Sequence, residues 1–223
     1  MASQMRRLGG RLRNFRLSAR RHGTLSTLLR YMDSQLHRLL KHEVCRVELS
    51  STDHSNLPNS DGYETRSIQS EEFRVRLCPE LAGSSNDKAF ARGDICIASL
   101  KDAEVVGFTF YTRQPTDVND AVIFRFPENF TYSYGSMTAL SHRGHKLESN
   151  RWKVAQIERI ANGSETPIVA YINVFNLESR AAHRRSSINE LVGYTGYCQL
   201  AGRWFCFRSP GCRRNNVGFW LRT

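Results

Sequence analysis

Basic residues and a glycine lie together where a strand-like stretch ends and a helical pattern begins. Residues 131–140 are strand-like, the turn contains Arg143 and Gly144, and the helical pattern starts at Lys146. Backbone N–H groups at the start of a helix have no partner within the helix and point toward a bound anion. Gly144 lets the main chain approach a phosphate closely, and the two cationic side chains add positive charge. The segment therefore indicates a phosphate-binding turn, and the alternative is an ordinary tight turn.

A mixed sheet is expected to position this turn. The strand-like runs 94–100 and 104–112 are joined by a short polar turn, as in a hairpin. The run 167–174 is apolar on both faces, as in a buried strand. Further expected elements are strands at 44–49, 63–68, 121–126, 194–200 and 203–207 and helices at 71–77, 84–91, 146–161 and from Asn176. This order predicts an α/β (α+β-like) fold, in which helices flank both faces of a central, mixed and mostly antiparallel sheet.

The first 46 residues carry most of the positive charge. Eleven Lys or Arg residues there face two acidic ones, which leaves +9 of the chain's +11. Apolar residues recur on one helical face over 24–42, which predicts an amphipathic helix that docks on the protein or on an anionic membrane surface. We expect residues 1–62 to form a basic N-terminal extension that ends in a polar loop, and residues 63–223 to form the main domain.

Several function classes receive no support from composition. No stretch approaches the ~20 apolar residues of a membrane-spanning helix, and residues 1–21 lack the apolar centre of a secretory signal. A cytoplasmic location is therefore expected. The six cysteines show no paired spacing typical of a metal site, so reduced, packed thiols and no metal are expected.

Several of these features resemble the GNAT superfamily of N-acyltransferases, over roughly residues 63–207. In that family a loop of the form Arg/Gln-x-x-Gly-x-Gly/Ala follows a strand and binds the CoA pyrophosphate, and here it would be residues 143–148. The stretch Asn176-Leu177-Glu178-Ser179 resembles the family's Asn-x-x-Ser/Ala at the next helix. Gly193-Tyr194 resembles a Gly-aromatic pair near the end of that helix. Paired strands within 94–112, with "VG" before an aromatic strand, also resemble the family.

The resemblance implies that acetyl-CoA or another acyl-CoA donates an acyl group to an amine of a small metabolite or sugar. Main-chain groups near Met137 and Ala139 would hold the pantetheine arm. The other implied donor-binding residues are Arg143, Gly144, His145, Lys146, Asn176 and Ser179. This chain departs from the pattern at Lys146 and Glu148, where the family has small residues: the Lys146 side chain could pair with a phosphate, and Glu148 would repel it unless turned away. The spacing between Asn176 and Gly193 is also longer than in the family. Either the helix is extended, or it stops at Ser186-Ser187 and Ser187-Ile188 replaces the Gly-aromatic pair.

The resemblance also implies direct attack of the amine on the thioester, which requires a neutral amine and is helped by a general base. The strand 131–141 contains no carboxylate, so Tyr132, Tyr134 or a held water is the candidate base. His183 stands where the family frequently has the Tyr that protonates the leaving thiolate. A solvated histidine on the helix surface is the alternative for His183, and polar turn residues are the expectation for His142 and His145.

Other readings of the chain remain open. The same fold could use acyl carrier protein as donor, as N-acyl amino acid synthases do, because a basic segment attracts an acidic carrier. A nucleic-acid-binding module is less consistent with an Arg-rich segment that lacks interleaved aromatic residues. A non-enzymatic scaffold is a third reading. The acceptor would meet residues 71–91 and the closing hairpin, and the terminal stretch 204–212 resembles bacterial proteins associated with surface polysaccharide synthesis.

Overall fold

The computed structural model describes residues 24, 27–28, 31–32, 35, 40–50, 62–82, 86–161, 166–186 and 189–222. The described positions among residues 24–40 are helical, and the rest of the expected N-terminal helix lies outside the described residues. No helix among the described residues is both long and apolar enough to cross a membrane.

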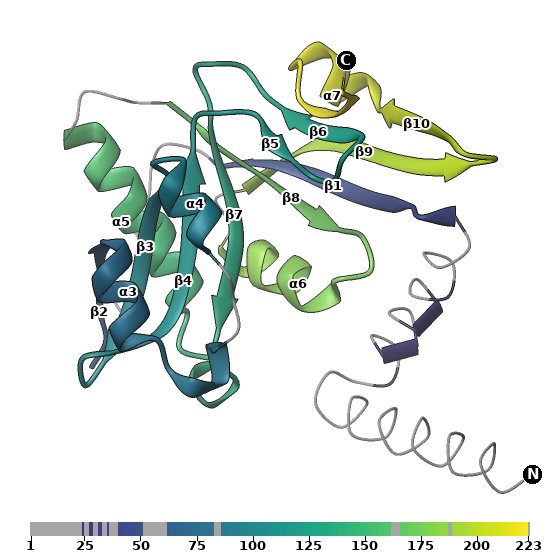
Figure 1. The fold of residues 1–223 in the computed structure, drawn as a ribbon. Helices are drawn as coiled ribbons and strands as arrows, with labels where there is room; N and C mark the ends of the chain where they lie inside the picture. Colours follow the sequence, from purple (N-terminus) through teal and green to yellow (C-terminus); the bar gives the residue numbers. More distant parts are fainter. Residues whose placement is uncertain are drawn as a thin grey trace, which may run out of the picture.

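An eight-stranded sheet forms the centre of the molecule, in the order β10-β9-β1-β8-β7-β4-β3-β2 (Figure 1). All its paired neighbours run antiparallel except β7 and β8. A smaller sheet has the order β11-β6-β5. The strands are β1 Glu43–Ser50, β2 Glu64–Ile68, β3 Ile95–Lys101, β4 Glu104–Thr112, β5 Thr116–Asp117, β6 Val122–Arg125, β7 Thr131–Thr138, β8 Ile168–Asn173, β9 Asn189–Leu200, β10 Arg203–Arg208 and β11 Gly218–Leu221.

Helices cover both faces of the large sheet, which confirms the predicted fold class. On one face Phe73 and Ala89 pack over alternate residues of β3 and β4, such as Phe108. On the other face Trp152 packs over the intervening residues, such as Tyr111. The helices are α3 Ser70–Arg76, α4 Asp87–Ala91, α5 Leu147–Ala161, α6 Leu177–Ser186 and α7 Pro210–Arg214, with short 3-10 turns η1 Pro79–Leu81 and η2 Leu140–His142.

Strand β1 lies inside the sheet, between β8 and β9. It is paired along its length with β9 and over 45–50 with β8. Cys45 and Val47 are fully buried in the core beneath the smaller sheet. The sequence places this strand in the N-terminal extension, and that placement is wrong for residues 43–50. The polar stretch after β1 marks a connection between two strands of one sheet, because β1 lies at its centre and β2 at its edge.

Most other predicted elements are confirmed, with ends shifted by a few residues. Strand β9 begins earlier than expected, so Gly193 and Tyr194 lie within a strand and not at the end of α6. The family-like role expected for this pair is therefore wrong. At Gly193 a side chain would meet the Ser209 hydroxyl at 2.1 Å, so close packing against the start of α7 explains this glycine. All six cysteines are free thiols, as expected.

Candidate functional site

A wedge opens between β7 and β8. The two strands pair only at Thr131 with Ile168 and Tyr132 with Val169, after which no further pairs form. Strand β7 continues along β4, while β8 continues along β1, so each strand stays held on its outer side. Residues 133–138 and 170–173 therefore form no ladder with each other. Figure 1 shows β7 and β8 diverging. Along the chain, α5 comes after β7 and α6 comes after β8. The wedge is the candidate site for an extended ligand.

A β-bulge lies in β7 beside the opening of the wedge. Tyr134 pairs with Phe110 and Met137 with Phe108, so two residues of β7 stand opposite one residue of β4. Gly135 has a φ of 62°, a left-handed conformation that glycine adopts without strain. Such a bulge re-aims neighbouring side chains and main-chain groups. Gly135, Ser136 and Met137 are all exposed, so the bulge is accessible to solvent.

The predicted phosphate-binding turn connects β7 to α5. Gly144 has a φ of 89° and Lys146 a φ of 58°, so two residues of the turn are left-handed. These are the positions that the sequence resemblance compares with a glycine-containing loop. A Cβ at Gly144 would meet no atom within 4 Å, so conformation and not crowding requires this glycine in the unliganded turn. Arg143, Gly144, His145 and Lys146 are exposed at the start of a fifteen-residue helix, which suits an anion.

The residues just before this turn already bind an anion from the same chain. The Glu80 carboxylate accepts hydrogen bonds from the Leu140 N–H at 2.7 Å and from the Ser141 hydroxyl at 2.6 Å. The hydroxyl contact, together with the backbone N–H groups, lowers the pKa of Glu80 below its ordinary value. The amides just after β7 are therefore oriented for negative charge, and Glu80 competes with any external anion for them.

The two positions expected to hold a pantetheine arm, Met137 and Ala139, differ in their exposure to solvent. The Ala139 N–H donates to the Val106 carbonyl at 2.9 Å, and the Ala139 carbonyl accepts from the His142 N–H at 3.0 Å. Ala139 is also buried. The Ala139 N–H thus extends the β4–β7 ladder, and donor binding by main-chain groups near Ala139 stays a prediction. Met137 lies at the wedge with its side chain exposed.

The start of α6 reaches across the wedge toward the turn. Asn176 accepts a hydrogen bond from the Ser179 N–H through its side-chain oxygen at 3.3 Å, so the Asn-x-x-Ser pattern is the N-terminal cap of this helix. Arg143 Nη1 lies 3.5 Å from Glu178 Oε2. This exposed ion pair joins the turn before α5 to α6 and bridges the outer end of the wedge.

His183 is buried in an ionic cluster and is not the solvated surface residue that the alternative describes. Its Nδ1 lies 2.8 Å from Glu48 Oε2, and its Nε2 lies 3.5 Å from Glu148 Oε1. Arg46 Nε lies 2.6 Å from the other oxygen of Glu48. Burial disfavours the imidazolium, but the hydrogen bonds and charges of the two glutamates outweigh it and raise the pKa of His183 to about 9. His183 is therefore a cation at neutral pH.

Glu148 points into this cluster and not toward the exposed turn. Burial disfavours its charge, but the hydrogen bond and charge of His183, the charge of Arg151 and a bond from Ser136 lower the pKa of Glu148 to about 2. Its side chain remains 28% exposed. Glu148 thus stays ionised on the α5 side of the wedge. The repulsion expected between this residue and a phosphate is reduced because His183 and Arg151 neutralise it.

Arg151 supports the bulge from beneath. Its guanidinium is fully buried and donates to four strand hydroxyls, those of Ser99, Thr109, Ser136 and Thr138, at 2.9–3.3 Å. Burial lowers the pKa of Arg151, and the charge of Glu148 opposes this effect. A Cβ at Gly107 would lie 2.7 Å from Arg151 Nη1, so the glycine of the "VG" pair makes room for the guanidinium.

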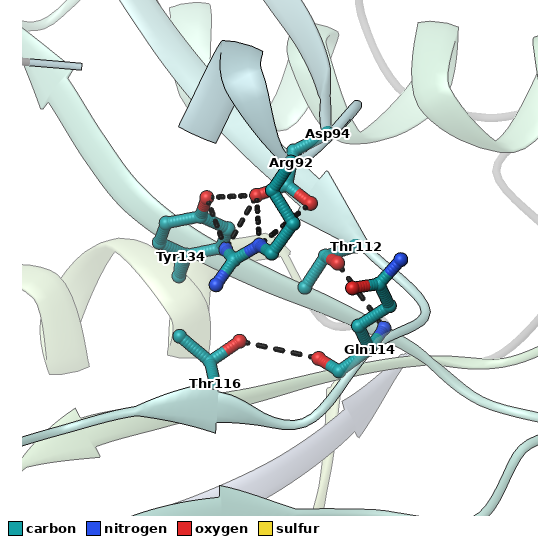
Figure 2. A network of polar contacts seen from close by, with 6 residues as sticks. All are labelled: Arg92, Asp94, Thr112, Gln114, Thr116 and Tyr134. Atoms are coloured by element: carbon teal, nitrogen blue, oxygen red, sulfur yellow. Dashed lines mark hydrogen bonds and ion pairs between the residues drawn. The ribbon is translucent and has the colours of Figure 1, made fainter. Parts of the chain in front are cut away.

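Tyr134 belongs to a different network on the opposite face of the sheet (Figure 2). Its hydroxyl donates to Asp94 and accepts from Arg92 Nη2 at 2.8 Å, and Arg92 Nε donates to the same carboxylate at 2.9 Å. Burial, followed by the hydrogen bond to Asp94, raises the pKa of Tyr134 well above its ordinary value. A phenol with a raised pKa that already donates its proton to a carboxylate does not act as a general base at neutral pH.

Three stacked tyrosines line this second face of the wedge. Tyr132 stacks on Tyr134 with ring centroids 5.4 Å apart and on Tyr171 of β8 with centroids 5.6 Å apart. The aromatic rings therefore cross from β7 to β8 where the strands separate. One face of the wedge is aromatic and the other is ionic.

Sequence reasoning missed much of the ionic face. Arg46 and Glu48 alternate with the apolar residues Cys45 and Val47 in β1. Such alternation is a signal that the strand has one core face and one polar face. It gave no indication that this polar face contacts His183, because Glu48 and His183 lie 135 positions apart in the sequence. The structure brings His183, Glu148 and Ser136 together, and separates Tyr134 from them by the sheet.

Comparisons with known proteins give structural similarity only. No protein-family model matches the sequence, and no curated protein matches it. Solved structures that align with the chain include a Drosophila protein at 15% identity and a TM-score of 0.47, over 78% of this chain and 57% of that one. A conserved Staphylococcus epidermidis protein of unknown function aligns at 10% identity and a TM-score of 0.48, over 75% and 65% of the two chains.

Two GNAT proteins also align. One is a tandem GNAT protein of the clavulanic acid biosynthesis pathway, at 14% identity and a TM-score of 0.44, over 69% of this chain and 53% of that one. The other is a GNAT-family acetyltransferase of Novosphingobium aromaticivorans, at 8% identity and a TM-score of 0.45, over 70% and 62%. The chain thus spans 53–65% of the length of these four proteins. At such scores the alignments carry no argument about activity, which rests on the site itself.

Proposed function

We propose that this chain is an N-acyltransferase that binds its acyl donor in the wedge between β7 and β8. The observation that carries the proposal is the divergence of these strands after Tyr132 and Val169, beside the bulge at Gly135. A thin acyl arm would lie between the strand edges and exchange hydrogen bonds with main-chain groups along them. The donor's phosphate would lie at the exposed turn of residues 143–146, at the start of α5.

In this scheme the acceptor is an amine that has lost its proton to water. Its nitrogen attacks the thioester carbonyl, the new C–N bond forms and the C–S bond breaks. The nitrogen then releases one proton to water to give the amide, and the thiolate takes a proton from solvent. N–H groups of the bulge would stabilise the oxyanion, because donors held in place ahead of the reaction need no reorganisation. We assign to His183 the role of positioning Glu148, since its protons are shared with two carboxylates. Tyr134 has a structural role in this proposal, because its pKa is raised and its hydroxyl already donates to Asp94.

A charge placed at the turn tests the phosphate assignment. Thermal unfolding is followed with acetyl-CoA, longer acyl-CoAs and acyl carrier protein carrying an acyl group. A donor at a hundred times its Kd stabilises the folded state by about 2.7 kcal/mol, which raises Tm by roughly 5–10 °C in a chain of this size. We expect Gly144→Glu to abolish this rise.

The matched control is Gly202→Glu in the β9–β10 turn. Gly202 also has a positive φ, 77°, and open space around its Cβ position. The control therefore suffers the same backbone strain and gains the same charge at a distance from the wedge, and it should keep the full donor response. Equal responses of the two variants would reject the phosphate-binding turn, and no response of the parent protein to any donor would reject the acyltransferase.

Acyl carrier protein is the second candidate donor, and Glu80 is the observation that favours it. This carboxylate is bound by the Leu140 N–H and the Ser141 hydroxyl, just before the turn of residues 143–146, and its negative charge there opposes a CoA pyrophosphate. A carrier-bound donor brings one phosphodiester and no adenosine diphosphate, and the basic N-terminal segment would attract the acidic carrier. Side-by-side initial rates with the same acyl group on CoA and on the carrier distinguish the donors. A carrier donor predicts the higher kcat/KM with acyl carrier protein and a marked decrease as salt increases.

A further inference from the structure

The smaller sheet has one face against the core and one face toward solvent. Strand β11 pairs with β6, and Phe219 lies opposite Phe124. Both of these phenylalanines are buried in the core. Because side chains alternate along a strand, Trp220 of β11 and Arg125 of β6 lie on the opposite, outer face. Arg125 is exposed and Trp220 is partly exposed, so this outer face presents an indole and a cation.

Arg208 of β10 reaches the same indole. Its guanidinium carbon, Cζ, lies 3.5 Å from the centroid of the Trp220 ring, and Arg125 Cζ lies 5.9 Å from that centroid. Gly218, which pairs with Arg125, makes room for the Arg208 side chain, because a Cβ there would lie 2.9 Å from Arg208 Cδ. Stacking on an indole stabilises a guanidinium and fixes the plane in which its N–H groups donate.

Positive charge gathers around this indole without an acidic partner. Within the part of the chain that the structure describes, neither Arg125 nor Arg208 forms a hydrogen bond or an ion pair with a carboxylate. Arg222, which follows β11, does have such a partner, since its Nη2 lies 2.9 Å from Asp117 Oδ2. Arg208 instead meets a third cation, because Arg213 of α7 donates from Nε to the Arg208 carbonyl at 2.9 Å. Burial, followed by the charge of Arg213, lowers the pKa of Arg208. A bound anion would relieve this repulsion.

We propose that Arg125, Arg208 and Arg213 form a binding site for the phosphate monoester of a small molecule. A planar guanidinium donates two parallel hydrogen bonds to a phosphate. A phosphate monoester carries a charge of about −1.5 to −2 at neutral pH, which balances more of the cluster than a carboxylate does. A nucleic-acid strand is less suited, because the Arg208 guanidinium already covers a face of the Trp220 ring on which a base would stack.

The arginine cluster is separate from the proposed donor site. Phe124, in the strand that carries Arg125, contacts Tyr132 at the start of β7, with ring centroids 4.7 Å apart. The turn of residues 143–146 follows the other end of that strand. Figure 1 shows α7 and β10 away from the arrowhead of β7. Phosphate binding at the cluster therefore requires no acyl donor.

Titration calorimetry of the full-length chain, without an acyl donor, tests the site. The probes are inorganic phosphate, glycerol 3-phosphate and glycerol, and we expect saturable binding of both phosphates and none of glycerol. Arg208→Gln should weaken phosphate binding by roughly tenfold or more, and Arg125→Gln by several-fold, because each variant loses charged hydrogen bonds to the ligand. Arg208→Lys should also bind several-fold more weakly than the parent, since an ammonium lacks the planar pair of donors.

Arg203→Gln is the matched control, because Arg203 is exposed and lies in the same strand on the other face of the hairpin. This variant should bind phosphate as the parent does. Gly144→Glu is the second control, since the turn of residues 143–146 also suits an anion, and it should keep the binding that Arg208→Gln loses. Thermal unfolding identifies the variants that remain folded. If Arg208→Gln is unfolded, Arg125→Gln decides, because Arg125 is exposed.

Three further results would overturn the proposal besides a parent protein that binds neither phosphate. Equal losses in Arg208→Gln and Arg203→Gln, or full binding by Arg208→Lys, would show attraction by net charge and no built site. Binding that is lost in Gly144→Glu and kept in Arg208→Gln would place the phosphate at the turn. An unphosphorylated single-stranded oligonucleotide that binds more tightly than glycerol 3-phosphate, and is lost in Arg208→Gln, would assign this face to nucleic acid.

Discussion

Replacing His183 with Gln should destabilise the protein at neutral pH and have a much smaller effect at high pH. The imidazolium lies between Glu48 and Glu148, and its removal leaves two carboxylates that face each other in a buried site. Breaking a buried ion pair by removing one partner costs about 3–5 kcal/mol. The variant's free energy of unfolding should be lower by about this amount at pH 6.

The pH dependence follows from the direction of the pKa shift. The folded-state pKa of His183 is about 9, above the ordinary 6.5, so the stabilisation is complete below pH 6.5 and is lost as pH rises through 9. At about 1.4 kcal/mol for each pKa unit, this interval corresponds to about 3 kcal/mol. The difference between parent and His183→Gln should shrink by that amount between pH 6 and pH 10.

Urea unfolding at several pH values measures this difference. Other groups that ionise near pH 10 affect parent and variant alike, so their contributions cancel in the difference. His145→Gln is the matched control, because His145 is exposed, and its effect should stay within about 0.5 kcal/mol at every pH. A difference between parent and His183→Gln that stays constant from pH 6 to pH 10 would refute the assignment of His183 as a buried cation.

Three further substitutions test other parts of the site. Lys146→Gly should raise Tm by a few degrees, since a left-handed non-glycine residue costs about 1–2 kcal/mol. Calorimetry measures the Tm, and a lower Tm would show that the turn is not strained. Tyr134→Phe should keep most of the acyl-transfer rate and lower the free energy of unfolding by about 1–2 kcal/mol, whereas a loss of rate of two orders of magnitude would make the phenol catalytic. Glu80→Gln should tighten acyl-CoA binding in titration calorimetry, because it removes a negative charge held at Leu140 and Ser141, just before the turn of residues 143–146. Unchanged affinity would place the donor phosphate elsewhere.

The sequence predicted the local elements well because their signals are local. The strand-like runs 94–100 and 104–112 around a polar turn, the both-faced apolar run 167–174 and the helical pattern before Ala161 each depend on a few neighbouring residues. Strand order is different, since it depends on contacts between distant segments. The position of β1 between β8 and β9 had no local signal, and the polar stretch after it looked like a domain boundary.

The same distinction applies to the site. The turn at Gly144 was predicted because glycine and basic residues mark it directly, and the structure places its left-handed conformation there. The cluster around His183 was not predicted, since it joins β1, α5 and α6. Glu148 looked unfavourable beside a phosphate until its partner was known. Ala139 looked available until its hydrogen bond to Val106 was seen.

Photo-crosslinking of the acyl arm tests the central claim most directly. An acyl donor with a diazirine on its acyl chain is bound to the full-length protein, irradiated, and the labelled peptides are identified by mass spectrometry, with an excess of unmodified donor as competitor. We expect competed labelling within β7 and β8, at residues 131–138 and 168–173, because these strands line the wedge. Competed labelling confined to other parts of the chain, such as the β9–β10 hairpin, would contradict the proposed donor site.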